Sequence, residues 1–103
     1  ITQADQGKSF EIRRGDRIAI RLAESPTTGY RWAIDQINSE AIALIDSTFS
    51  LGSEAGVGGG GVRTFTFQAK TAGTAQIRLK KWRDWEGDSS IDQRFDVTVR
   101  VRD

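Results

Sequence analysis

Apolar and polar residues alternate along most of the chain, which is the pattern of a β-strand with one buried face. The alternation recurs in short runs that are separated by turn residues such as glycine, asparagine, aspartate and serine. The predicted strands span residues 10–12, 18–22, 30–34, 42–49, 65–69, 75–79 and 95–101. The run at 42–49 is the least regular, and a helical turn over residues 39–44 is the alternative there.

One polar face per run predicts antiparallel pairing, because the strands of parallel sheets are usually covered on both faces. About seven short strands without a long helix predict an all-β fold, an immunoglobulin-like antiparallel β-sandwich. A small barrel of about five or six strands is the alternative. Trp32, in phase with Tyr30 and Ile34, is predicted to lie in the core. The length fits a single domain over residues 1–103, since domains commonly have roughly 100–150 residues.

The order of the strands predicts which connections lie together. If each strand runs opposite to the one before it, the connections alternate between the two ends of the sandwich. The short, ordinary turns around Gly15, Asn38 and Ala72 then share one end. Three unusual loops, 24–29, 51–61 and 83–91, share the other end. Loops clustered on a rigid scaffold commonly carry binding function.

The composition excludes several kinds of chemistry. The chain has no cysteine and no histidine, so disulfides, nucleophilic cysteines, histidine bases and thiolate or imidazole metal sites are excluded. We therefore expect no enzyme, no cofactor and no metal. Fifteen basic and fourteen acidic side chains leave a formal charge of +1, which favours neither nucleic acid nor an anionic membrane as a partner. No apolar run approaches the roughly 20 residues of a membrane helix.

The first residue also bears on where the protein works. The chain begins at Ile1 and contains no methionine. Removal of an export signal would explain this start, and excision at an arbitrary boundary explains it equally well. On the first explanation we expect a periplasmic or secreted protein.

The first unusual loop has the composition of a stiff turn. Pro26 fixes its own φ at about −65° and favours extended geometry at Ser25, whereas Gly29 can adopt a positive φ. Such a loop is narrow and carries the hydroxyls of Thr27 and Thr28 near its tip. A plain hairpin turn with threonines for solubility is the alternative.

The other two loops differ from it in character. Residues 56–61 contain five glycines, which suit either a flexible spacer or a backbone that another chain can approach closely. The third loop follows a strand on which Trp82 shares the outward phase of Arg78 and Lys80, and it carries Arg83 and Trp85. Because Trp and Arg dominate many binding sites, this loop is a candidate contact surface.

The three loops carry motifs that resemble those of the chagasin-like inhibitors of cysteine peptidases, inhibitor family I42. The motifs are Ser25-Pro26-Thr27-Thr28-Gly29, Gly58-Gly59-Gly60-Gly61 and Arg83-Asp84-Trp85. They resemble, in order and spacing, that family's Asn-Pro-Thr-Thr-Gly, Gly-x-Gly-Gly and Arg-Pro-Trp loops. Ser25 and Asp84 depart from this pattern, and the glycine run allows a second register at 56–59.

The resemblance implies an immunoglobulin-like fold and a reversible, non-covalent inhibitor of papain-like cysteine peptidases. The motif residues would then be the peptidase-binding residues, with the first loop over the catalytic thiol and the other two on either side. We expect a monomer whose partner is such a peptidase, with no nucleic-acid or membrane partner.

The main alternative is a module that binds single-stranded nucleic acid or a glycan through residues 78–85. Basic residues interleaved with aromatic rings suit single strands. A carbohydrate-binding module that uses Trp82 and Trp85 is a related option. In either case the threonine and glycine loops would have no role.

Overall fold

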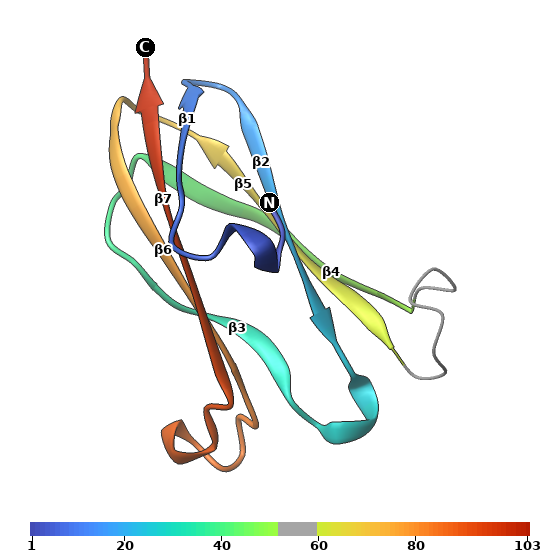
Figure 1. Cartoon of the computed structure of the whole chain (residues 1–103). Coiled ribbons are helices and arrows are strands. Elements are labelled where there is room, and N and C mark those ends of the chain that lie inside the picture. The colour runs from blue at the N-terminus through green and yellow to red at the C-terminus, as the bar shows by residue number, and fades with distance from the viewer. Residues whose placement is uncertain (52–59) are drawn as a thin grey trace.

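The computed structural model describes residues 1–51 and 60–103, and this part of the chain forms seven strands and three short 3-10 turns (Figure 1). The strands are β1 (Ser9–Arg13), β2 (Arg17–Glu24), β3 (Arg31–Ile37), β4 (Ile42–Leu51), β5 (Gly61–Ala69), β6 (Gly73–Trp82) and β7 (Gln93–Arg102). The turns are η1 (Gln3–Asp5), η2 (Pro26–Thr28) and η4 (Asp88–Ser90). In these two segments no helix has the length and apolar character that crossing a membrane requires.

The strands form two sheets. One has four strands in the order β1-β7-β6-β3, and the other has three in the order β2-β5-β4. The predicted sandwich is therefore confirmed, and the barrel alternative is wrong for the described residues. Every pair is antiparallel except β1 with β7, which is parallel. Because an even number of chain reversals separates these two strands, they run in the same direction and can pair only in parallel.

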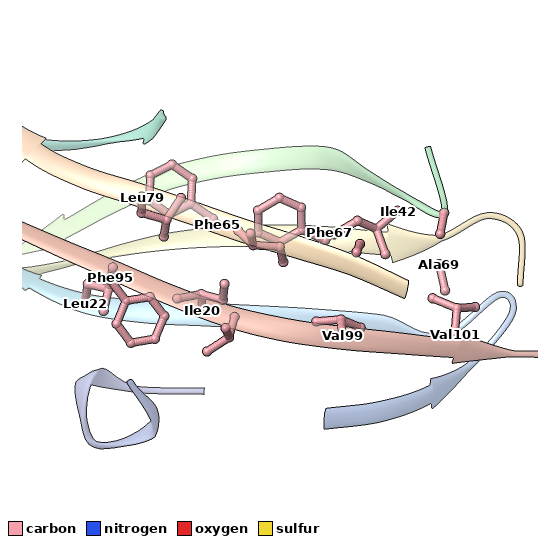
Figure 2. Close-up of a cluster of buried hydrophobic side chains, with 14 of the residues drawn as sticks. Ile20, Leu22, Ile42, Phe65, Phe67, Ala69, Leu79, Phe95, Val99 and Val101 are labelled. Atoms are coloured by element: carbon pink, nitrogen blue, oxygen red, sulfur yellow. The ribbon is translucent and has the colours of Figure 1, made fainter. Parts of the chain in front are cut away.

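Inward-facing side chains of both sheets form one core (Figure 2). The alternation directs apolar residues inward and threonine, glutamine and basic residues outward, most regularly in β7, where alternate residues are buried. The exception is β4, most of which is exposed. The buried apolar residues are Ile20, Leu22, Trp32, Ala41, Ile42, Phe65, Phe67, Ala69, Ala75, Ile77, Leu79, Phe95, Val97, Val99 and Val101. Trp32 is 5% exposed, which confirms its predicted place in the core.

The strand ends that border the three unusual loops lie at one end of the sandwich. In the three-stranded sheet, Gly61 pairs with Glu24 on one side and with Leu51 on the other. In the four-stranded sheet, Arg31 at the start of β3 pairs with Trp82 at the end of β6. Figure 1 shows η2 and the loop between β6 and β7 at this lower end, opposite the β1–β2 and β5–β6 turns. The predicted clustering is thus confirmed for the first and third loops.

Replacing Trp32 by alanine is expected to lower the free energy of unfolding by about 3–5 kcal/mol, the usual effect of deleting a large buried aromatic side chain. The variant also loses the 2.9 Å hydrogen bond that the Trp32 indole donates to the carbonyl of Ala23. Urea unfolding curves measure the change. Trp85→Ala is the control, because Trp85 is 68% exposed and surface substitutions usually change stability by less than about 0.5 kcal/mol. A larger loss in Trp85→Ala than in Trp32→Ala would contradict this assignment of the core.

Candidate functional site

The first loop is a closed turn that its own side chains stabilise. Residues Pro26–Thr28 form η2. The Thr28 hydroxyl donates to the carbonyl of Ser25 at 2.9 Å and accepts from the amide of Tyr30 at 3.3 Å. The hydroxyls of Ser25 and Thr27 lie 3.2 Å apart and form a hydrogen bond. These bonds satisfy polar groups of the turn without a partner protein, so the loop is shaped before it meets one.

This geometry gives the two threonines different roles. Thr28 uses its hydroxyl within the loop, both as donor and as acceptor. Thr27 is exposed, and among the described residues its hydroxyl is bonded to Ser25 alone, so its oxygen keeps a free lone pair. Of the two, Thr27 is therefore the better placed to form a hydrogen bond with another molecule.

The third loop is closed around Ser90. The amide of Arg83 donates to the Ser90 hydroxyl oxygen at 3.0 Å. The carbonyl oxygens of Arg83 and Gly87 lie 3.0 and 2.7 Å from the same hydroxyl, and either can accept its proton. The amide of Glu86 also donates to the Arg83 carbonyl at 3.0 Å. These bonds convert residues 83–90 into a compact turn at the end of β6.

Arg83 joins the third loop to the first. Its Nε and Nη2 atoms both donate to the carbonyl of Thr28, at 3.2 and 3.0 Å. Its Nη1 atom pairs with the carboxylate of Glu86 at 3.1 Å, and its guanidinium lies 4.4 Å from the centre of the Tyr30 ring. Each nitrogen of the guanidinium thus has an acceptor within the protein. The structure shows Arg83 as the link between two loops, and its predicted contact with a peptidase stays a prediction.

Trp85 lies across the first loop at Gly29. A Cβ atom added at Gly29 would lie 2.7 Å from the end of the Trp85 ring, and Gly29 has a φ of +78°. Glycine is therefore required twice here, for the positive φ and for the close approach of the ring. The end of the Trp85 ring thus packs against the first loop, while 68% of the residue's surface stays exposed.

Asp84 occupies the exposed position between Arg83 and Trp85. Within the described residues it takes part in no hydrogen bond or ion pair, in contrast to Glu86, which is bonded to Arg83. Its carboxylate is therefore available to another molecule. The same part of the chain contains no group of three or more acidic residues arranged to hold a metal ion.

The glycine run is described only in part. Gly58 and Gly59 lie outside the described residues. Gly60 precedes β5, and Gly61 is buried within it, paired with Glu24 and Leu51. The backbone of Gly61 is thus engaged on both sides, unlike the open loop position expected for it. A Cβ atom there would lie 2.5 Å from the ring of Phe49, so the residue is glycine because an aromatic ring covers it.

Trp82 is half-buried on the outer face of its sheet, as its phase in the strand predicts. The ammonium of Lys80 lies 3.5 Å from the centre of the Trp82 ring. The same ammonium pairs with the carboxylates of Asp35 at 3.6 Å and Asp88 at 3.5 Å. One ring face is therefore covered by a cation that two acids hold in place. This arrangement counts against stacking of a base or sugar on Trp82, on which the alternative function of residues 78–85 depends.

Sequence reasoning missed the groups that support the loops. Glu24 was assigned to the first loop, but it is a buried inward-facing residue of β2. Its carboxylate forms an ion pair with Arg63 at 2.9 Å. Ser90 and Tyr30 were also missed as supports of the loops. The inward phase of Glu24, shared with Ile20 and Leu22, was the one available signal.

Known proteins of similar sequence and fold include inhibitors of cysteine peptidases. Residues 11–99 match the family described as chagasin family peptidase inhibitor I42. Chagasin of Trypanosoma cruzi is 27% identical over 105 residues, which cover 98% of this chain and 96% of that protein. The crystal structure of the cysteine protease inhibitor EhICP2 of Entamoeba histolytica superposes with a TM-score of 0.85 at 25% identity, covering 99% of this chain and 93% of that one. PbICP-C, solved in complex with falcipain-2, has the same fold, with a TM-score of 0.70 at 16% identity over 94% of this chain and 91% of that one.

Replacing Gly29 by alanine is expected to displace the Trp85 ring, because the added Cβ atom would lie 2.7 Å from it. Gly7→Ala is the matched control, since Gly7 has a similar φ of +77° but no atom within 4 Å of an added Cβ, and it lies outside the three loops, just before β1. Both variants should lose about 1–2 kcal/mol of stability from the positive φ. Only Gly29→Ala should shift the NMR resonance of the Trp85 indole N–H. An unchanged Trp85 resonance in Gly29→Ala would show that the ring does not rest on Gly29.

Proposed function

The chain belongs to the chagasin family of peptidase inhibitors, and we propose that it blocks the active-site cleft of papain-like cysteine peptidases with its three loops. Inhibition is reversible and non-covalent. The observation that carries the proposal is the joining of the first and third loops, through the bonds from Arg83 to the Thr28 carbonyl. Two loops held in one arrangement before binding form a preformed surface.

Each loop has a distinct role in this proposal. The first loop, Ser25-Pro26-Thr27-Thr28-Gly29, enters the cleft over the catalytic thiol, with Thr27 as the residue whose hydroxyl is exposed. Trp85 is the apolar anchor on one side, and Asp84 lies beside it at the rim. Gly58, Gly59 and Gly60 offer bare backbone to an extended segment of the peptidase on the other side.

Preorganisation supports tight binding by such a small surface. Ordering a mobile side chain at an interface costs roughly 0.5–1.5 kcal/mol. The bonds within the first loop and the contacts of Arg83 are already formed in the free protein. Standard inhibitor interfaces bury roughly 800 Å² on each partner, an area that three loop tips can supply.

The inhibitor itself takes no part in bond chemistry in this proposal. The chain has no cysteine or histidine, and as a member of an inhibitor family it is not an enzyme. The turn of η2 departs from the extended backbone that a peptidase cleaves. The peptidase is therefore occluded by the first loop without cutting it.

Titration of this protein into papain, with a fluorogenic peptide as substrate, is expected to abolish activity at micromolar excess or below. After long incubation, mass spectrometry should detect neither an adduct nor cleavage between Ser25 and Tyr30. Dilution should restore the activity. Full activity at micromolar excess would refute the proposal for papain, and a stable covalent complex would refute its mechanism.

Replacing Trp85 by alanine is expected to weaken inhibition by about 2 kcal/mol or more, roughly thirtyfold, because exposed Trp residues are frequent hot spots. The fold should remain intact, since the side chain lies outside the core. Arg14→Ala and Asp16→Ala serve as controls, because both residues lie in the β1–β2 turn at the opposite end of the sandwich. Loss of inhibition in the controls but not in Trp85→Ala would show that the binding surface lies at the β1–β2 end of the sandwich, and would contradict the proposal.

A further inference from the structure

A buried carboxylate lies directly beneath the first loop. Glu24 is the last residue of β2, and its side chain is 2% exposed. One carboxylate oxygen accepts the backbone N–H of Trp32 at 2.6 Å. The other forms the 2.9 Å ion pair with Arg63. Because Glu24 precedes the loop and Trp32 follows it, this one carboxylate holds both ends of the loop.

Arg63 extends the contact to the adjoining ends of β4 and β5. It lies on β5, two residues after Gly61, and is 19% exposed. Its guanidinium lies 5.3 Å from the centre of the Phe49 ring, which belongs to β4. The Phe49 ring in turn covers Gly61. The ion pair therefore connects the base of the first loop to both strands that lead into and out of the second.

Stability alone is a weak reason for this pair. Burying two charges removes them from water, and an apolar pair of similar volume often stabilises a protein as well or better. Unlike an apolar contact, an ion pair between a guanidinium and a carboxylate requires a particular orientation of the two groups, because they bond in a fixed geometry. At the base of the first loop, this orientation fixes the end of β2 relative to β5.

We infer that Glu24 and Arg63 are positioning residues for inhibition, and that their ion pair fixes the position of the first loop relative to the paired ends of β4 and β5. The inference rests on the proposed inhibition of papain-like peptidases. Glu24 has too little exposed surface to touch a peptidase, so any effect of its charge on inhibition has to pass through the position of the loop.

The decisive variant is the double substitution Glu24→Gln with Arg63→Met. Glutamine keeps an oxygen that accepts the Trp32 N–H, and methionine keeps an apolar chain against Phe49, so the ion pair is the main loss. The matched control is Glu11→Gln with Arg102→Met. That pair also has a 2.9 Å separation, but its side chains are 51% and 68% exposed and lie away from the loops, on β1 and β7.

The expected result is an inhibition constant for papain raised about tenfold or more in the Glu24/Arg63 variant, roughly the effect of one or two side chains that have to be ordered on binding. The control should change it less than twofold. Amide hydrogen exchange at Thr28 and Tyr30, whose N–H groups are bonded within the loop, should quicken in the Glu24/Arg63 variant alone. Thermal unfolding confirms that both proteins are folded at the assay temperature.

Unchanged exchange in the first loop, together with unchanged inhibition, would overturn the inference. If the double variant does not fold, Arg63→Lys replaces it. Lysine keeps the charge but loses the paired geometry of the guanidinium. This variant should give the same changes in exchange and inhibition to a smaller degree. Exchange in the loop is measured without a peptidase. Failure of the wild-type protein to inhibit papain would therefore refute the proposed function, while the exchange data still decide whether the pair positions the loop.

Discussion

The hydrogen bonds that Trp32 donates across the two sheets are the contacts on which the loop-bearing end of the molecule depends. Elsewhere the sheets meet through apolar side chains, which favour close packing but have no directional preference. At Trp32, the backbone N–H donates to the carboxylate of Glu24 and the indole donates to the carbonyl of Ala23. Trp32 lies on β3 and its two acceptors on β2, so directional bonds cross from one sheet to the other where the first loop begins and ends.

The loops continue this arrangement outward. Arg83 bonds to the first loop from the third, and the ion pair of Glu24 with Arg63 reaches toward the second. Hydrogen bonds that involve a charged group are roughly twice as strong as neutral ones, and an aromatic ring lies beside each cation, Tyr30 beside Arg83 and Phe49 beside Arg63. Most charged and hydroxyl groups around the first loop are thus engaged within the protein. Within residues 1–51 and 60–103, the Trp85 ring, the Thr27 hydroxyl and the Asp84 carboxylate are exposed groups of the first and third loops that keep surface or bonding capacity for another molecule.

The strands and the common end of the loops could be predicted from sequence because both follow from short-range pattern. Alternation fixes which residues face inward, and alternating direction fixes which connections share an end. The partners of Arg83 could not be predicted in this way, because its contact with Thr28 spans 55 residues and depends on how the sheets are placed. The burial of Glu24 could not be predicted for the same reason. A charged residue next to a loop is expected to be exposed to solvent, and its partner Arg63 lies 39 residues away in the sequence.

The two departures from the family motif can be understood from these contacts. Ser25 stands where asparagine is usual. The loop uses its backbone carbonyl as acceptor for Thr28, which any residue supplies, and its short polar side chain to bond to Thr27. Asp84 stands where proline is usual, and proline would stiffen the turn through its fixed φ. Here the stiffness comes from other bonds, those of Ser90 to the backbone on both sides of the turn and of Glu86 to Arg83. Because the turn does not need a rigid residue at position 84, that position can carry a charge, and the variable part of the motif lies on the surface that a peptidase would meet.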